Sequence, residues 1–221
     1  MKVNAESVFT GTQPLVDDLL GNVEVRRKTA RLAGYAIVTS ALYGFTMGLG
    51  HSPLQASSSA IKVPLLFLLT LSVCLPTLHF IGLLFGSRVA FSHTAVVLLT
   101  GITLTSVLLG AFAPISLFFL ASGSDYEFLL FLHVLTFAFC GAAGLQSVNK
   151  TYGAILHTSN QPSGIAIHLL KVWMFLYMFV GTQTAYNLAP FIERETTFKW
   201  FDRAPGNFYT YLWNALVEMA K

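Results

Sequence analysis

Five stretches of this sequence are each long and apolar enough to cross a lipid bilayer as an α-helix. A spanning helix needs roughly 20 consecutive, mostly apolar residues. Inside a bilayer the backbone must satisfy its own hydrogen bonds, so such stretches fold as helices. We therefore predict an all-α, polytopic membrane protein with five transmembrane helices, at residues 32–50, 63–86, 93–121, 126–148 and 165–192.

The composition argues against a soluble protein. Of 221 residues, 54% are hydrophobic and only 10% are charged, whereas soluble domains average about 25% charged residues. The net charge of +3 is too small to indicate nucleic-acid binding. Cys74 and Cys140 both lie inside apolar runs, which favours small buried side chains over a disulfide. We expect contact with membrane lipids and no nucleic-acid partner.

Positive charge is distributed unevenly around the predicted spans. Four basic residues lie just before the first span, between residues 26 and 31, and Arg88 and Lys150 lie in loops on the same side. Cytoplasmic loops carry an excess of Lys and Arg. We therefore expect an integral protein of the bacterial inner membrane, with a cytoplasmic N-terminus and, after five crossings, an extracytoplasmic C-terminus.

The predicted spans divide the chain into three parts. Residues 1–31 form a cytoplasmic segment with an amphipathic helix, residues 32–192 form the five-helix transmembrane domain, and residues 193–221 form an extracytoplasmic tail with a second amphipathic helix.

Both flanking helices carry candidate contact residues. Leu15 and Leu19 share the apolar face of the first. Asn207 is a plausible cap for the second, and Trp200 and Trp213 lie where an interfacial aromatic belt is expected. We expect Leu15, Leu19, Trp200 and Trp213 to contact the membrane interface or a protein partner.

Two histidines are the candidate ionisable residues at membrane depth. His79 lies in the second predicted span and His133 in the fourth, and such residues are functional candidates by default. Their depths differ by about 13 Å at the helical rise, so we expect no shared metal. The favoured interpretation is a neutral histidine bonded across the bundle. The alternative is that His79, beside the helix-kinking Pro76, forms a pocket.

A polar patch ends the fifth predicted span. Gln183, Tyr186 and Asn187 share one helical face by their i, i+3, i+4 spacing. Lipid does not accept such a face, so we expect it to point into the bundle or toward a partner. Packing within the bundle is the favoured interpretation, and a ligand site is the alternative.

Small residues predict close contacts between helices. Gly44 and Gly48 form a GxxxG pair in the first span, and Gly141 and Gly144 belong to a strip of small residues in the fourth. Such residues let two helix backbones approach closely, either within one chain or between copies.

The sequence contains no HExxH, Walker, CxxC or EF-hand pattern. We therefore expect no enzyme activity, no cofactor and no metal. The leading hypothesis is a noncatalytic membrane subunit or scaffold that assembles with itself or with a larger membrane complex. The alternative is a small channel or transporter with a polar path through His79, Gln183 and Asn187. An intramembrane enzyme ranks last because no nucleophile and base converge.

Three short motifs carry a family resemblance. They are "ALYGFTMG" at residues 41–48, "LFGSRVAFSHTAVVLL" at residues 84–99, and "FAPISLF" at residues 112–118. In these motifs the chain resembles the Yip1 family of five-span membrane proteins. The resemblance implies a compact helical bundle that serves as a membrane scaffold or trafficking adaptor without catalysis. The chain also resembles bacterial multispan proteins of this size, which implies no particular activity.

Overall fold

The computed structural model describes residues 25–84, 86, 89–158, 163–192, 200–201 and 206–219. The helices are α3 (Val25–Gly48), α4 (Pro53–Leu84), α5 (Phe91–Ala121), α6 (Tyr126–Thr158), α7 (Ser163–Leu188) and α8 (Phe208–Met219). The described part of the chain contains no strand, which confirms the all-α class. The expected N-terminal amphipathic helix, with Leu15 and Leu19, lies outside the described residues.

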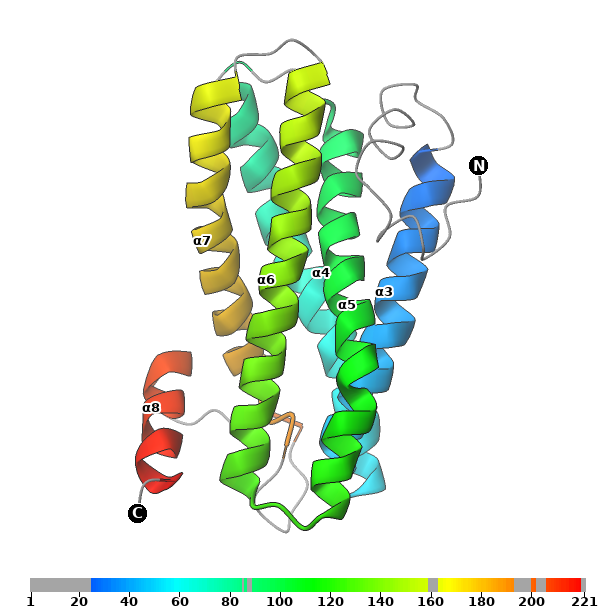
Figure 1. Ribbon diagram of the computed structural model, residues 1–221, viewed down its shortest axis with the longest axis vertical. Coiled ribbons are helices and arrows are strands. Elements are labelled where there is room, and N and C mark those ends of the chain that lie inside the picture. The colour runs from blue at the N-terminus through cyan, green and yellow to red at the C-terminus, as the bar shows by residue number, and fades with distance from the viewer. Residues whose placement is uncertain are drawn as a thin grey trace.

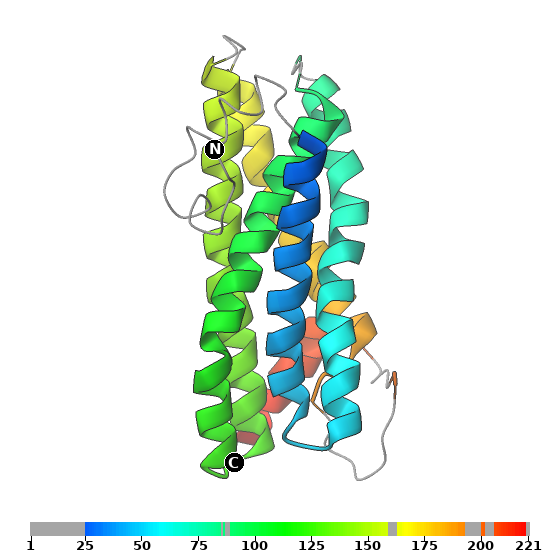
Figure 2. The same ribbon diagram turned by 90° about the vertical axis from the view of Figure 1, so that its right-hand side faces the viewer.

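Helices α3 to α7 stand side by side along the long axis of the molecule, and each runs antiparallel to the next (Figure 1). Figure 2 shows α3 lying between α4 and α5. We call the end of the bundle where α3 begins the proximal end, and the opposite end, where α7 finishes, the distal end. The short α8 lies near the distal end, beside α6 and α7.

Three of the helices are long and apolar enough to cross a membrane. By length and composition these are α4, α5 and the Tyr126–His157 part of α6, within the residues that were searched. They suggest a membrane protein. Helices α3 and α7 accompany them along the bundle at two further predicted spans, and a five-span arrangement stays a prediction.

Three helices extend well beyond the predicted spans. Helix α3 begins at Val25 and not at residue 32, α4 begins at Pro53 and not at residue 63, and α6 continues to Thr158 and does not stop at residue 148. At the start of α4, Ser52 Oγ accepts a hydrogen bond from the Gln55 backbone N–H at 3.1 Å. A capping serine followed by proline at the first helical position is a favourable helix start. The turns that follow are polar, so the apolar pattern that predicts a membrane span begins only later in the helix.

The surface of the bundle is apolar and much of its interior is polar. Large side chains on the outside include Val38, Phe139 and Phe175, which are 68%, 64% and 72% exposed. Buried positions include Ser40, Lys62 and His133. Water would favour the reverse arrangement, whereas lipid accepts apolar side chains and drives polar ones into helix contacts.

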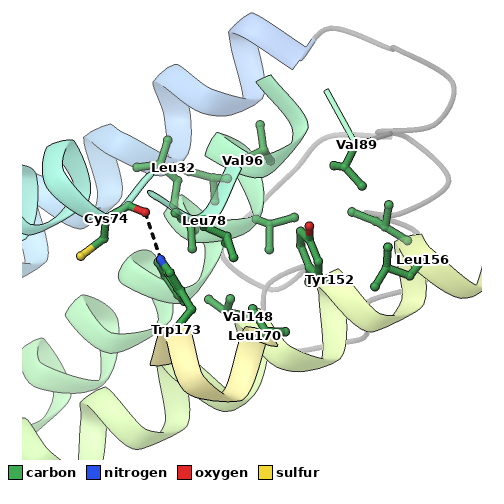
Figure 3. Close-up of a cluster of buried hydrophobic side chains, with 14 residues drawn as sticks. Leu32, Cys74, Leu78, Val89, Val96, Val148, Tyr152, Leu156, Leu170 and Trp173 are labelled. Carbon is green, nitrogen blue, oxygen red and sulfur yellow. Dashed lines mark hydrogen bonds between the residues drawn. The ribbon is translucent and has the colours of Figure 1, made fainter. Parts of the chain in front are cut away.

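Two clusters of buried apolar side chains hold the bundle together. The proximal cluster joins α3, α4, α5, α6 and α7 around Leu32, Tyr152 and Trp173 (Figure 3). There the Trp173 indole N–H donates to the backbone carbonyl of Cys74 at 3.2 Å, which ties α7 to α4. The distal cluster is built around Tyr43 and Ile192.

Candidate functional site: a cavity in the helix bundle and its polar groups

His133 of α6 joins α3 and α5 through hydrogen bonds. Its Nδ1 lies 2.7 Å from the Tyr43 hydroxyl oxygen, and its Nε2 lies 3.4 Å from Ser116 Oγ. All three side chains are buried. A neutral imidazole offers one donor nitrogen and one acceptor nitrogen, so one hydroxyl donates to the ring while the other accepts from it. This arrangement satisfies His133 without a charge.

The second deep histidine, His79, packs against an aromatic ring. It lies near the proximal end of α4, where its imidazole meets Phe91 of α5 edge to face, with ring centroids 5.2 Å apart. His133 lies near the distal end of α6, so the structure does not bring the two histidines together. Within the described residues, no group of three or more His, Cys, Asp or Glu side chains could hold a metal ion.

The start of α4 carries a polar face that holds the segment after α7. Lys62 Nζ and Gln55 Nε2 both donate to the Pro190 carbonyl, at 2.8 and 3.0 Å, and Ser59 Oγ donates to the Phe191 carbonyl at 2.5 Å. The Lys62 ammonium also lies 5.4 Å from the centre of the Phe201 ring. These side chains fix the course of the chain where it leaves the bundle.

A cavity of about 640 Å³ lies between α4, α5, α6 and α7. Residues 189–192 line it near the distal end, together with Phe208, Leu212 and Asn214 at α8. Its volume falls in the range of small-molecule sites, roughly 300–1,000 Å³. The cavity is therefore a candidate ligand site.

The two ends of this cavity differ in polarity. Its deep part is lined by apolar side chains such as Leu98, Val148 and Trp173. The distal part is lined by Tyr126 and Glu127 in the first turn of α6, and by Tyr186 near the end of α7. His133 and Asn214 add further polar groups there. The cavity therefore has an apolar interior and a polar end.

The residues of the polar patch at the end of α7 have different surroundings in the structure. Tyr186 lines the cavity. Asn187 is exposed, and its side-chain amide donates to the Gln183 backbone carbonyl of its own helix at 2.9 Å. Neither Gln183 nor Asn187 is among the residues that line the cavity, and His79 is not among them either. The cavity therefore does not include the expected path through His79, Gln183 and Asn187, which stays a prediction.

The four glycines singled out in the sequence have two kinds of surroundings. Gly44 and Gly48 face the backbone of α4 near Ser59 and Ala56, and Gly144 faces Gly101 of α5. A Cβ at any of these three would meet backbone atoms of the neighbouring helix. Gly141 has open space where its Cβ would be, and it lines the cavity instead.

Aromatic side chains mark the distal end of the described chain. Trp200 and Trp213 are 51% and 67% exposed. Helix α8 begins as expected at Asn207, whose side-chain oxygen accepts the backbone N–H groups of Tyr209 and Thr210, both at 3.0 Å. The Tyr209 ring stacks on Phe179 of α7, with centroids 6.5 Å apart, which docks α8 beside the bundle.

Comparison of the chain with protein-family models, with curated proteins and with solved structures found no match. The class of protein therefore rests on the fold and the site: an all-α chain with membrane-compatible helices and an internal cavity.

Sequence reasoning missed the polar face of α4 and the cavity. Gln55, Ser59 and Lys62 recur at helical spacing, which was the available signal, but they precede the apolar run. The cavity is formed by residues far apart in the chain, so no local pattern indicates it.

Proposed function

We propose that this chain is a noncatalytic integral membrane subunit or scaffold that crosses the bilayer five times. The observation that carries the proposal is the set of hydrogen bonds that the buried polar side chains make. His133 bonds Tyr43 and Ser116, and the α4 face bonds the carbonyls of Pro190 and Phe191. These contacts hold helices together. Ser116 is a hydroxyl beside the His133 imidazole, but it is buried and does not line the cavity, so this pair offers a substrate no accessible nucleophile.

The proposed orientation places the proximal end in the cytoplasm. Arg26, Arg27 and Arg31 lie at the start of α3, while Asp125 and Glu127 lie at the opposite end of the bundle. Lys and Arg favour the cytoplasmic side. This supports a bacterial inner-membrane protein with its N-terminus inside and its C-terminus outside. The Yip1-like membership remains part of the proposal and rests on the three sequence motifs alone.

The proposed partner surface is a stripe on α8 formed by Trp213 and Val217, which lie four residues apart and are both exposed. Tyr209, one turn earlier, stacks on Phe179 of α7 and docks the helix instead. Aromatic side chains of this kind favour a membrane interface or a protein contact. The proposal is that this stripe meets a second copy of the chain or a larger complex at the outer surface.

The mass of the complex in mild detergent tests this assembly. We expect the wild-type protein to run as more than one chain, and Trp213→Glu to shift it to a single chain. A matched control is Phe118→Glu, since Phe118 is 66% exposed and also lies near the distal end, but on α5 away from the stripe. A wild-type protein that is monomeric, or an assembly that survives Trp213→Glu, contradicts the proposed role of α8.

The cavity favours a second candidate function, a small transporter. Two of the polar residues selected from the sequence, His133 and Tyr186, line it, whereas His79, Gln183 and Asn187 do not. Flux of a small polar solute through proteoliposomes, measured for the wild type and for His133→Leu and Tyr186→Phe, distinguishes the two functions. Flux that is reduced by both variants supports transport. Wild-type flux no greater than that of empty liposomes rules it out.

A further inference from the structure

We propose that the cavity binds one hydrocarbon chain of a membrane amphiphile, with its tail in the deep part and a headgroup without negative charge at the polar end. This inference rests on the proposed membrane location and goes beyond the proposed scaffold function. The sequence motifs and the hydrogen bonds described above do not identify a ligand for this cavity.

The first argument is the size and the lining of the cavity. Its volume of about 640 Å³ suits a small ligand, and Leu98, Val148 and Trp173 offer dispersion contacts to an apolar chain. Among the more deeply placed lining residues, Thr70 and Thr105 carry hydroxyl groups, and Thr105 already donates to the Gly101 carbonyl, so water finds few partners there. In a bilayer the abundant molecule that suits such a surface is a lipid tail.

The second argument is access from the side. Ala138 and Ala142 on α6 are exposed although they line the cavity, and so is Met178 on α7. The cavity is partly open and not enclosed, and these lining residues of α6 and α7 have accessible surface. Gly141 has open space at its Cβ position, and a Cβ at Gly181 would make only ordinary contact with Thr70 of α4, so both glycines leave free volume for a chain.

The third argument is the chemistry of the polar end. Tyr126, Tyr186 and Asn214 provide hydrogen-bonding groups, and Glu127 provides a carboxyl group. Among the described residues that line the cavity, none is Lys or Arg. Lys62 is near in the fold, but it lies outside the lining and donates to the Pro190 carbonyl. The described lining therefore offers a phosphate headgroup no cation, whereas it offers a hydroxyl or amine headgroup matching partners.

Photolabelling tests the proposal. Full-length protein in phosphatidylcholine vesicles is exposed to three hexadecyl probes that carry a diazirine in the tail and differ in their hydroxyl, amine or phosphate headgroup. We expect the hydroxyl or amine probe to label peptides of α5 and α6 at the deep end, and the phosphate probe to label at least fivefold less.

The matched variants are Gly141→Phe and Gly153→Phe. Both glycines lie on α6 with open space at the Cβ position, but only Gly141 lines the cavity. We expect Gly141→Phe to reduce labelling about tenfold and Gly153→Phe to leave it unchanged. The Glu127→Gln variant distinguishes the two headgroups. If only labelling by the amine probe is lost, the headgroup is an amine. If labelling by both probes is unchanged, the headgroup is a hydroxyl.

Equal labelling of the two phenylalanine variants, or preferred labelling by the phosphate probe, overturns the proposal. Carbonate extraction of the same vesicles reports membrane insertion separately. A wild-type protein that resists extraction but is not labelled contradicts the cavity site alone, whereas one that is extracted contradicts the membrane location on which it rests.

Discussion

At the scale of single residues, His133 shows how a polar side chain is accommodated inside the bundle. The Tyr43 hydroxyl and Ser116 Oγ lie on its two ring nitrogens, so the ring needs no charge and no water. Removing one member of such a network leaves a buried group unsatisfied, while removing two partners of matched shape is far less costly.

We therefore predict non-additive effects in a double-mutant cycle. Tyr43→Phe and His133→Leu should each lower the free energy of unfolding by about 1 kcal/mol, and the double variant should lose clearly less than the sum of the two. Thermal unfolding in detergent measures this, with the exposed Tyr35→Phe as control. Additive losses would show that the hydrogen bond contributes no coupling.

A second prediction concerns Lys62. Replacing it with methionine removes a buried charge and one donor to the Pro190 carbonyl, so the desolvation cost that disappears offsets much of the lost bond. We expect little change in melting temperature but faster backbone hydrogen exchange in residues 191–192. Exposed Lys171→Met is the control. Unchanged exchange in the Lys62 variant would mean that Gln55 and Ser59 hold the segment without it.

At the scale of helices, the glycines separate contacts from open surface. Gly44 of α3 approaches the backbone of α4 at Ser59, where a Cβ has no room, whereas Gly34 of the same helix faces open space. At Gly44 the missing side chain permits a close approach of α3 to α4. At Gly34 it makes no such contact possible and only lowers the stability of the helix.

This difference predicts opposite signs for one substitution. Gly34→Ala should raise the free energy of unfolding by up to about 1 kcal/mol, through helix propensity. Gly44→Ala should lower it by about 1–3 kcal/mol, because the added methyl group forces the helices apart. Thermal unfolding of both variants in one detergent checks the pair. Stabilisation by Gly44→Ala would contradict the close approach of α3 and α4.

The sequence predicts helices well and their partners poorly. Apolar runs and turn residues place all five long helices, because lipid imposes one backbone solution on each run. The start of α4 at Pro53 was missed, since its first turns are Ser-rich and polar. The pairing of Tyr43 with His133 was also missed, because the two are 90 residues apart and only tertiary packing joins them.

The same reason applies to the candidate site. His133 could be selected from the sequence as a deep polar residue, and Tyr186 as part of a polar patch. The cavity that they share requires the relative placement of four helices and the chain after α7. Gln183 and Asn187 carry the same sequence signal as Tyr186, yet they do not line the cavity, because small differences in helix rotation decide which side chains do.

At the scale of the whole molecule, the account depends on how many times the chain crosses the bilayer. Three helices meet the length and composition of a span, and α3 and α7 lie alongside them (Figures 1 and 2). Buried polar groups and exposed apolar ones are arranged as a lipid solvent requires. If all five cross, the two ends of the bundle face different compartments.

Labelling of single cysteines from outside intact cells tests this most directly. In a background that lacks Cys74 and Cys140, the positions are Arg27→Cys, Ser92→Cys, Ser124→Cys and Trp200→Cys. Five crossings predict that an impermeant maleimide reaches residues 124 and 200 but reaches residues 27 and 92 only after permeabilisation. Labelling of residues 27 and 200 from the same side would contradict five crossings and the account built on them. Labelling of residues 27 and 92 from outside, with residues 124 and 200 protected, would contradict only the orientation.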